Sequence, residues 1–324
     1  MIGIKDISFL RRTKLALSLI GCTLIIGCKS DKVNPDFITE HVFIVVIDGP
    51  RYTETWGDPY HANIQLQSAL QAEGTLYTNF RNTGMTFTVP GHVALTTGYY
   101  QEISNNGLEI PSQPSIFQYW MHDYNKTPND AWIIASKDKL AVLANCEETS
   151  WTNHYMPMTN CGVNGLGVGN GYRDDSTTFV RAMEIINEHH PSLTLINFRE
   201  PDYSAHSGDW GNYLEGIQST DQYIDSLWKF IQSDPIYKDK TTLFVTNDHG
   251  RHSTGIENGF AGHGDGCEGC RRISLLALGP DFKKGVEINE LHSQIDIPLT
   301  ISYLLDFKLY HHMEGRVLTG LKYQ

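Results

Sequence analysis

The chain has 324 residues, of which 40% are hydrophobic and 19% are charged, a composition typical of a globular protein and not of a disordered one. Its formal net charge is -12 at pH 7. This acidity argues against nucleic acid as a partner, because sequence-independent binding needs basic surface to displace counterions. A small anionic substrate stays compatible with it, since a site can be locally cationic on an acidic protein.

The N-terminus is typical of a bacterial secretion signal. A basic stretch precedes the apolar run LALSLIGCTLIIGC, which is too short to span a membrane comfortably. Of the two lipoprotein cleavage boxes, which end at Cys22 and Cys28, the second leaves the longer apolar core. We predict a signal peptide over 1–27, a lipid on Cys28 and a tether over 28–38. An uncleaved anchor or an ordinary secretion signal is the alternative.

This prediction places the protein at the bacterial cell envelope, facing the periplasm or the cell exterior. The lipid would be its only contact with the membrane, and the sequence does not determine its oligomeric state. Residues 39–324 would form one domain.

Short apolar runs alternate with amphipathic segments along that domain. Nearly continuous β-branched runs predict buried strands, and the amphipathic segments 177–190 and 212–232 predict helices that end before a proline. This alternation indicates an α/β protein with a mostly parallel sheet that is covered on both faces. The segments at about 100–130 and 144–176 are expected to form a small cap insertion. The predicted strands are 41–48, 131–136, 193–198, 241–248 and 273–279.

Export to an oxidising compartment would favour disulfide bonds, and an even number of cysteines follows Cys28. The close pairs are Cys146 with Cys161 and Cys267 with Cys270, and we predict that they form disulfides. The rival interpretation of CEGC is half of a zinc site, but no second Cys-x-x-Cys exists to complete it.

Polar residues cluster where the predicted strands end. Ligands of open α/β sheets bind outside the carboxyl ends of the strands, so these residues are expected to meet at one edge. Three Asp and three His exceed what helix capping requires, and oxygen and imidazole donors suit zinc or a similar divalent metal. Six ligands fit two metals, an arrangement that suits phosphoryl transfer. The residues are Asp48, Asp202, His206, Asp248, His249 and His263, with Thr88 and His92 in the stretch TFTVPGH.

The ordered motifs VVIDG, TVPGH, EPDYSAH, NDHG and GHG resemble the alkaline phosphatase superfamily, in particular its type I phosphodiesterase/nucleotide pyrophosphatase and phosphatase branches. The resemblance implies a three-layer α/β/α sandwich, a catalytic domain over 39–324, and two Zn²⁺ or other divalent ions. It further implies that Thr88 is a metal-coordinated nucleophile, which gives a phospho-threonine, and that His92 orients the loop from behind. The implied ligands are Asp202, His206 and His263 for one metal, and Asp48, Asp248, His249 and Thr88 for the other.

The branch is indicated by ASKDKLAVL. Its Lys137 and Lys139 resemble the K-x-K or K-x-R element of monoester-specific phosphatases and phosphonoacetate hydrolases, where two cations hold the phosphoryl oxygens. A solvated turn is the alternative for such a pair. The phosphate-binding Asn of these families is expected at Asn105 or Asn106. Sulfatase chemistry is disfavoured, because TVPGH lacks both the precursor Cys or Ser and the arginine of the sulfatase motif.

We therefore predict a zinc-dependent phosphatase of small phosphate monoesters. A phosphodiesterase or phosphonate hydrolase on the same site is the first alternative, and a non-catalytic surface-binding lipoprotein is the second. The leaving group is expected to contact the segments 99–130 and 144–176. Their aromatic residues Tyr100, Trp120, Trp151 and Tyr155 could form a wall of the site or part of the core.

Overall fold

The computed structural model of the protein describes residues 37–322. The predicted signal peptide and the predicted lipid attachment at Cys28 lie outside these residues. No helix between residues 37 and 322 combines the length and the apolar character that crossing a bilayer requires.

A mixed sheet of nine strands forms the centre of the described chain, in the order β4-β3-β5-β1-β6-β7-β2-β8, with β9 also paired to β2. Most pairs are parallel, as predicted, whereas β7 runs antiparallel to both β6 and β2. The strands are β1 (His41–Asp48), β2 (Gly74–Arg81), β3 (Ala131–Ala135), β4 (Met158–Cys161), β5 (Leu193–Pro201), β6 (Thr241–Asn247), β7 (Arg272–Leu278), β8 (Val286–Ile288) and β9 (His292–Ser293).

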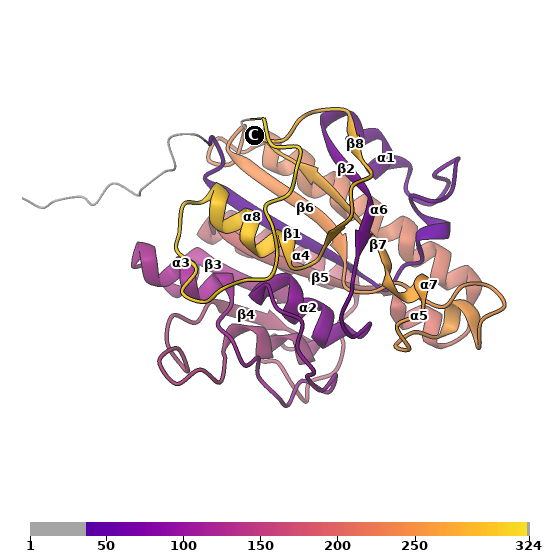
Figure 1. The fold of residues 1–324 in the computed structure, drawn as a ribbon, viewed down its shortest axis with the longest axis horizontal. Helices are drawn as coiled ribbons and strands as arrows, with labels where there is room; N and C mark the ends of the chain where they lie inside the picture. Colours follow the sequence, from indigo (N-terminus) through magenta and orange to yellow (C-terminus); the bar gives the residue numbers. More distant parts are fainter. Residues whose placement is uncertain (1–36, 323–324) are drawn as a thin grey trace, which may run out of the picture. The chain divides into compact units, whose positions relative to one another are not determined.

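Helices cover both faces of this sheet (Figure 1). Every residue of the central strand β1 is buried, and its side chains alternate between two cores, as the period of a strand requires. Ile44 packs in the core that α2, α3 and α8 cover, and Val45 packs in the core under α1, α4 and α6. The predicted three-layer α/β/α architecture is therefore confirmed. The helices are α1 (Gln65–Leu70), α2 (Thr88–Thr97), α3 (Ile116–Tyr124), α4 (Asp175–His189), α5 (Asp202–His206), α6 (Trp210–Ser233), α7 (Glu268–Arg271) and α8 (Asp296–Leu304).

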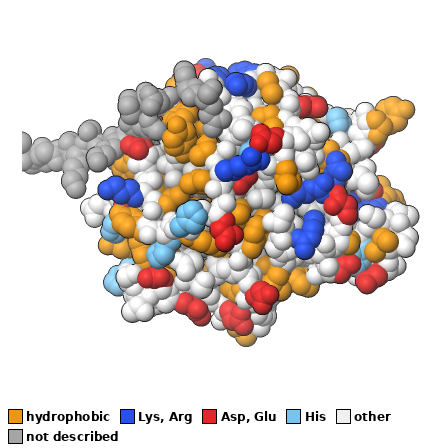
Figure 2. Space-filling model, in the orientation of Figure 1, with side chains coloured by type: hydrophobic (Ala, Val, Ile, Leu, Met, Phe, Trp, Pro, Cys, Tyr) orange, Lys and Arg blue, Asp and Glu red, His pale blue; other side chains and the backbone are white. Residues whose placement is uncertain are grey.

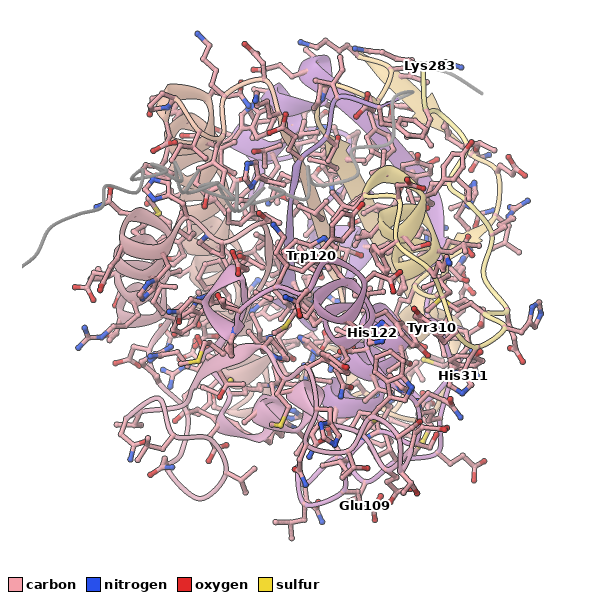
Figure 3. The ribbon with its side chains drawn as sticks, turned by 90° about the vertical axis from the view of Figure 1, so that its left-hand side faces the viewer. Glu109, Trp120, His122, Lys283, Tyr310 and His311 are labelled. Carbon is pink, nitrogen blue, oxygen red and sulfur yellow. The ribbon has the colours of Figure 1, made fainter. Side chains whose placement is uncertain are left out.

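The two segments expected to form a cap are tied into the main layers. Segment 100–130 contains α3, and segment 144–176 contributes β4 to the edge of the sheet beside β3. The chain after α8 returns across α3, where the Tyr310 hydroxyl lies 3.1 Å from His122 Nδ1 and the Tyr119 hydroxyl lies 2.7 Å from His311 Nδ1. Figure 3 shows His122, Tyr310 and His311 close together on this side of the molecule.

The predicted disulfide bonds are not formed in this structure: Cys146, Cys161, Cys267 and Cys270 are all free thiols. Cys161 Sγ donates to the carbonyl of Ile133 at 3.6 Å, and Cys146 is buried in the hydrophobic core. Cys267 and Cys270 belong to a cluster described below.

The face seen in Figure 2 mixes Lys and Arg with Asp, Glu and hydrophobic side chains. That face carries no extended basic surface of the kind that nucleic-acid binding needs.

Candidate active site

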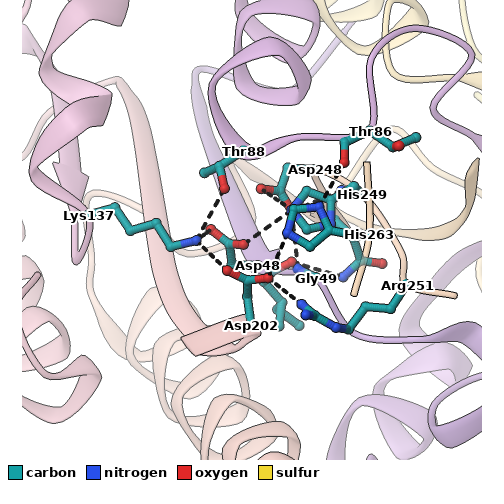
Figure 4. A network of polar contacts seen from close by, with 12 residues as sticks. Asp48, Gly49, Thr86, Thr88, Lys137, Asp202, Asp248, His249, Arg251 and His263 are labelled. Carbon is teal, nitrogen blue, oxygen red and sulfur yellow. Dashed lines mark hydrogen bonds and ion pairs between the residues drawn. The ribbon is translucent and has the colours of Figure 1, made fainter. Parts of the chain in front are cut away.

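The carboxyl ends of three adjacent parallel strands meet at one edge of the sheet. Asp48 ends β1, Asp202 directly follows β5, and Asp248 directly follows β6, and β1 lies between the other two strands. Gly49 has a φ of +60°, and a Cβ there would lie 2.9 Å from the ring of His249. A glycine is therefore required for the chain to turn away directly after Asp48. Figure 4 shows the resulting network.

Asp202, His206 and His263 form the first group of facing donor atoms. Asp202 Oδ1 lies 3.3 Å from His206 Nε2 and 3.4 Å from His263 Nε2, and the two Nε2 atoms are 3.1 Å apart. His263 Nδ1 donates to the carbonyl of Thr86 at 2.9 Å. This bond leaves a lone pair on His263 Nε2, the arrangement that a metal-ligating histidine needs.

Asp48, Asp248 and His249 form the second group. His249 Nε2 lies 3.5 Å from Asp48 Oδ1 and 3.6 Å from Asp248 Oδ2. All three atoms are buried and have no hydrogen-bond partner within the described chain. His249 Nδ1 donates to Gly250 O at 2.9 Å, which again leaves the lone pair on Nε2. Buried polar atoms are rarely left without partners, so this donor set fits a shared divalent cation.

The two groups are neighbours, because the rings of His249 and His263 stack with centroids 3.9 Å apart. Their members coincide with the two sets of three Asp and His residues predicted from the sequence. Two divalent ions, one held by each group, would therefore lie in one site.

Burial and charge act in opposite directions on these side chains. Burial raises the pKa of Asp48 to about 6, although Lys137 opposes the shift, and burial and Asp48 raise the pKa of Asp248 well above its usual value. Burial also disfavours ionisation of Asp202, yet Lys137, His206 and Arg251 hold its pKa well below its usual value. Burial lowers the pKa of His263 to about 4, which keeps this imidazole neutral. Additional positive charge is what would ionise Asp48 and Asp248 together.

Thr88 is the first residue of α2, and the N-cap position belongs to Phe87. It is therefore not itself the helix cap. A Cβ on Gly91 would lie 2.5 Å from Asp248 O, so this glycine allows the first turn of α2 to pack against the end of β6. His92 is buried behind Thr88, and its Nδ1 donates to Thr88 O at 2.8 Å. This contact matches the orienting role expected for His92.

Lys137 reaches the site from the loop after β3. Its buried Nζ lies 3.2 Å from Thr88 Oγ1, 2.8 Å from Asp48 Oδ2 and 2.7 Å from Asp202 Oδ2. Burial opposes its charge, but Asp202 and Asp48 outweigh burial and raise the Lys137 pKa above its usual value. Lys137 is therefore a permanent cation beside the Thr88 hydroxyl.

Lys139 lies farther out and is joined to the site through Asn105. Its Nζ donates to Asn105 Oδ1 at 3.0 Å, and the same oxygen accepts from Val89 N at 2.9 Å. Asn105 thus caps a free amide in the first turn of α2. The structure does not bring Asn106 into this group: its Oδ1 accepts from Leu108 N at 2.8 Å, within an exposed turn.

Two site residues were missed from the sequence. Arg251 is fully buried, donates to Asp202 Oδ1 and holds Ala261 O at 2.9 Å. The sequence signal that could have identified Arg251 was its position directly after the NDHG motif. The Tyr172 ring lies 5.7 Å from Lys137 Nζ and 6.0 Å from Lys139 Nζ, which is within the range of cation–π interactions. Only its place in the irregular segment 144–176 pointed toward it.

A pocket of about 450 Å³ lies beside the site, and its lining includes Thr86 and Gly264, which are close in the chain to Thr88 and His263. Of the four aromatic residues considered for a wall, Tyr100 lines this pocket. Trp120 and Trp151 are buried in the core, and Tyr155 packs edge-to-face on His122.

Comparison with known proteins gives the family. The model of the family "Type I phosphodiesterase / nucleotide pyrophosphatase" matches residues 42–260. A 2,3-bisphosphoglycerate-independent phosphoglycerate mutase of Haloquadratum walsbyi is 28% identical over 138 residues, which are 42% of this chain and 26% of that protein. The chain therefore spans about a quarter of the length of this curated relative.

Solved structures share the fold at low identity. The phosphonate monoester hydrolase of Agrobacterium radiobacter is 14% identical with a TM-score of 0.61, covering 86% of this chain and 76% of that one. An alkaline phosphatase superfamily protein from Vibrio parahaemolyticus is 17% identical with a TM-score of 0.59, covering 87% and 70%.

The fold and the two adjacent groups of donor atoms define an α/β/α protein with a candidate two-metal hydrolase site. The chain belongs to the type I phosphodiesterase / nucleotide pyrophosphatase family. The alternative of a non-catalytic binding protein is not supported, because both groups of donor atoms are intact beside Thr88.

Proposed function

We propose that the protein is a zinc-dependent phosphatase that hydrolyses small phosphate monoesters through a phospho-threonine at Thr88. The observation that carries this proposal is the position of Lys137, whose ammonium contacts the Thr88 hydroxyl and lies between Asp48 and Asp202. A phosphoryl group attacked by Thr88 would lie next to the Lys137 ammonium. The monoester carries one more anionic oxygen than a diester, so a fixed cation favours it electrostatically.

The imidazole and carboxylate donors support zinc as the metal. When bound, two such ions would neutralise the phosphoryl oxygens and lower the pKa of a coordinated hydroxyl. The residues of the protein carry out the remaining steps. Thr88 Oγ1 forms the bond to phosphorus as the ester oxygen leaves, and its own proton passes to solvent. Water then cleaves the phospho-threonine, so that phosphate leaves and the Thr88 hydroxyl is restored.

Helix α2 supports this chemistry through its N-terminus. Thr88 is the first helical residue, and the positive end of the helix dipole favours an anion. The positive charge of Lys139 adds to this field, since Asn105 joins it to the first turn of α2. The Tyr172 ring lies within cation–π range of the ammonium groups of both lysines.

A phosphodiesterase or a phosphonate hydrolase is the alternative, and the match of residues 42–260 to the phosphodiesterase family favours it. The two functions are separated by comparing the zinc-loaded enzyme on an aryl phosphate monoester, the matching diester and phosphonoacetate. We expect the highest kcat/KM for the monoester. A higher value for the diester or for phosphonoacetate would overturn the monoesterase proposal.

We propose further that the enzyme is anchored to the bacterial cell envelope through a lipid on Cys28. The apolar run LALSLIGCTLIIGC, which ends at Cys28, supports this proposal. Mass spectrometry of the N-terminal peptide from the membrane fraction tests it, and an unmodified Cys28 with an intact signal would contradict it.

A further inference from the structure

A third cluster of metal-ligating side chains lies outside the two groups of the active site. His252, Asp265, Cys267 and Cys270 each contribute one donor atom, and all four atoms lie within 4.8 Å of one another. We propose that these residues form a separate site for one zinc ion, with a structural role. The proposal does not depend on which ester the active site hydrolyses.

His252 gives the strongest evidence for a cation at this place. Its side chain is 3% exposed, and its Nδ1 lies 3.1 Å from Asn258 Oδ1. Because that oxygen only accepts hydrogen bonds, Nδ1 carries a proton, and in the neutral imidazole Nε2 then carries the lone pair. Nε2 has no hydrogen-bond partner in the described chain, yet it lies 3.2 Å from Asp265 Oδ1. A lone pair that faces a carboxylate oxygen is repelled by it, and a metal cation held between the two atoms would remove that repulsion.

The two thiols complete the donor set. Cys267 is the N-cap of α7 and Cys270 lies within this short helix, the close spacing that zinc sites commonly use. Two thiolates, one imidazole and one carboxylate can surround zinc tetrahedrally, with Zn–S distances of about 2.3 Å and Zn–N distances of about 2.0 Å. Thiolate donors also set this site apart from the oxygen and nitrogen donors of the active site.

A disulfide between Cys267 and Cys270 is the competing interpretation, and it accounts for less of the structure. Both residues are free thiols here. A disulfide would also leave the buried His252 Nε2 without a partner, which is costly for a buried polar atom. A zinc ion satisfies all four side chains at once.

The cluster lies on the segment that positions the active site. Gly250 N donates to Cys270 O at 2.8 Å, directly after His249. On the other side, His263 precedes Asp265 by two residues, and Gly266 N donates to Thr86 Oγ1 at 3.2 Å. A metal ion in the cluster would therefore fix the segment that supplies one ligand to each group of the active site.

Cobalt reconstitution tests the proposal on the full chain. Co²⁺ bound by thiolates gives a charge-transfer band in the near ultraviolet, which oxygen and nitrogen ligands do not give. The reduced wild-type protein loaded with Co²⁺ should show this band, and Cys267→Ser with Cys270→Ser should lose it together with about one zinc equivalent per chain. The matched control Cys146→Ala removes a thiol elsewhere and should keep the band.

A second control separates this site from the active site. His206→Ala removes a donor of the first group and should leave the charge-transfer band unchanged, whatever happens to hydrolysis. Asp265→Asn keeps both thiols and serves if the cysteine variants do not fold. This variant should weaken Co²⁺ affinity, measured by titrating the charge-transfer band, by about tenfold or more. Absence of the band in reduced wild-type protein, its persistence in the double cysteine variant, or a Cys267–Cys270 disulfide in protein taken from the cell envelope would overturn the proposal.

Discussion

The ammonium of Lys137 lies 3.2 Å from the hydroxyl oxygen of Thr88, and both side chains are buried. The two residues are 49 positions apart and come from different elements, the start of α2 and the loop after β3 (Figure 4). A fixed cation at this point stabilises negative charge that develops on a phosphoryl group during attack by the hydroxyl. The predictions below separate the roles of the hydroxyl, of the two lysines and of the carboxylates.

Replacing Thr88 by Ala removes the proposed nucleophile. We expect turnover of an aryl monoester to fall by roughly 10³-fold or more, because the nucleophile acts in every cycle. The zinc content should change little, because Asp48, Asp248 and His249 remain to hold the second metal. The unfolding midpoint should also change little, since the hydroxyl's hydrogen bond is the one from Lys137. Thr88→Ser keeps a hydroxyl and should retain much of the activity. An Ala variant as active as wild type would exclude Thr88 as the nucleophile.

The double variant Lys137→Ala with Lys139→Ala tests selection of the phosphate charge state. Charge-assisted hydrogen bonds contribute about 1.5–3 kcal/mol each, so kcat/KM for the monoester should fall by about 10²-fold or more. The matching diester has one anionic oxygen fewer and should lose clearly less. Lys229→Ala, on an exposed face of α6, serves as the control. Equal losses on both substrates would mean that the lysines do not distinguish the esters.

The sequence predicted the parts of the fold in which pattern and chemistry coincide. Strand β1 is apolar from Val42 to Ile47 and ends in Asp48, so the sequence indicated both its burial and the functional residue at its end. Strand β2 was missed because GTLYTNFR mixes polar and apolar residues, and β8 has only three residues. The antiparallel direction of β7 has no sequence signal, since a buried strand is equally apolar in either direction.

The site shows a similar limit. The Asp and His residues at the strand ends were found because the carboxyl ends of parallel strands meet. Arg251 and Tyr172 were missed because their roles depend on which side chains they contact. The CEGC motif was interpreted as a disulfide because its further donors, His252 and Asp265, belong to no second Cys-x-x-Cys. Only the folded loop brings these four side chains together.

The pH dependence of hydrolysis should report the charge on Lys139. Burial and the neighbouring Lys137 lower the pKa of Lys139 to about 8, so this side chain is charged below that pH and becomes neutral above it. Monoester kcat/KM should therefore decline as the pH rises through about 8. Arg at this position stays protonated, and Lys139→Arg should lack that decline. The same alkaline limb in both enzymes would assign it to another group.

Removal of the metals should expose the cost of the buried carboxylates. Burial and Asp48 raise the pKa of Asp248 well above its usual value. A carboxyl whose pKa is higher in the folded protein than in the unfolded chain, where it is about 3.9, binds more protons when folded. The contribution of Asp248 to the stability of the metal-free protein should therefore fall as the pH rises above about 4. At neutral pH, Asp248→Asn removes the ionisable carboxyl, whose ionisation favours the unfolded chain, and should raise the free energy of unfolding of the metal-free protein by about 1–3 kcal/mol.

With zinc bound, the wild type should be more stable than Asp248→Asn, the reverse of their order without metal. Ligand that binds only the folded state stabilises it by about 2.7 kcal/mol at a hundred times its Kd, so zinc should stabilise the wild type strongly. Asp248→Asn loses a donor of the second group and should gain much less from zinc. Unfolding by urea, with and without a chelator, measures all four values. If zinc stabilised both proteins equally, or if the chelated variant were the less stable of the two, Asp248 would not be a metal ligand held at an energetic cost.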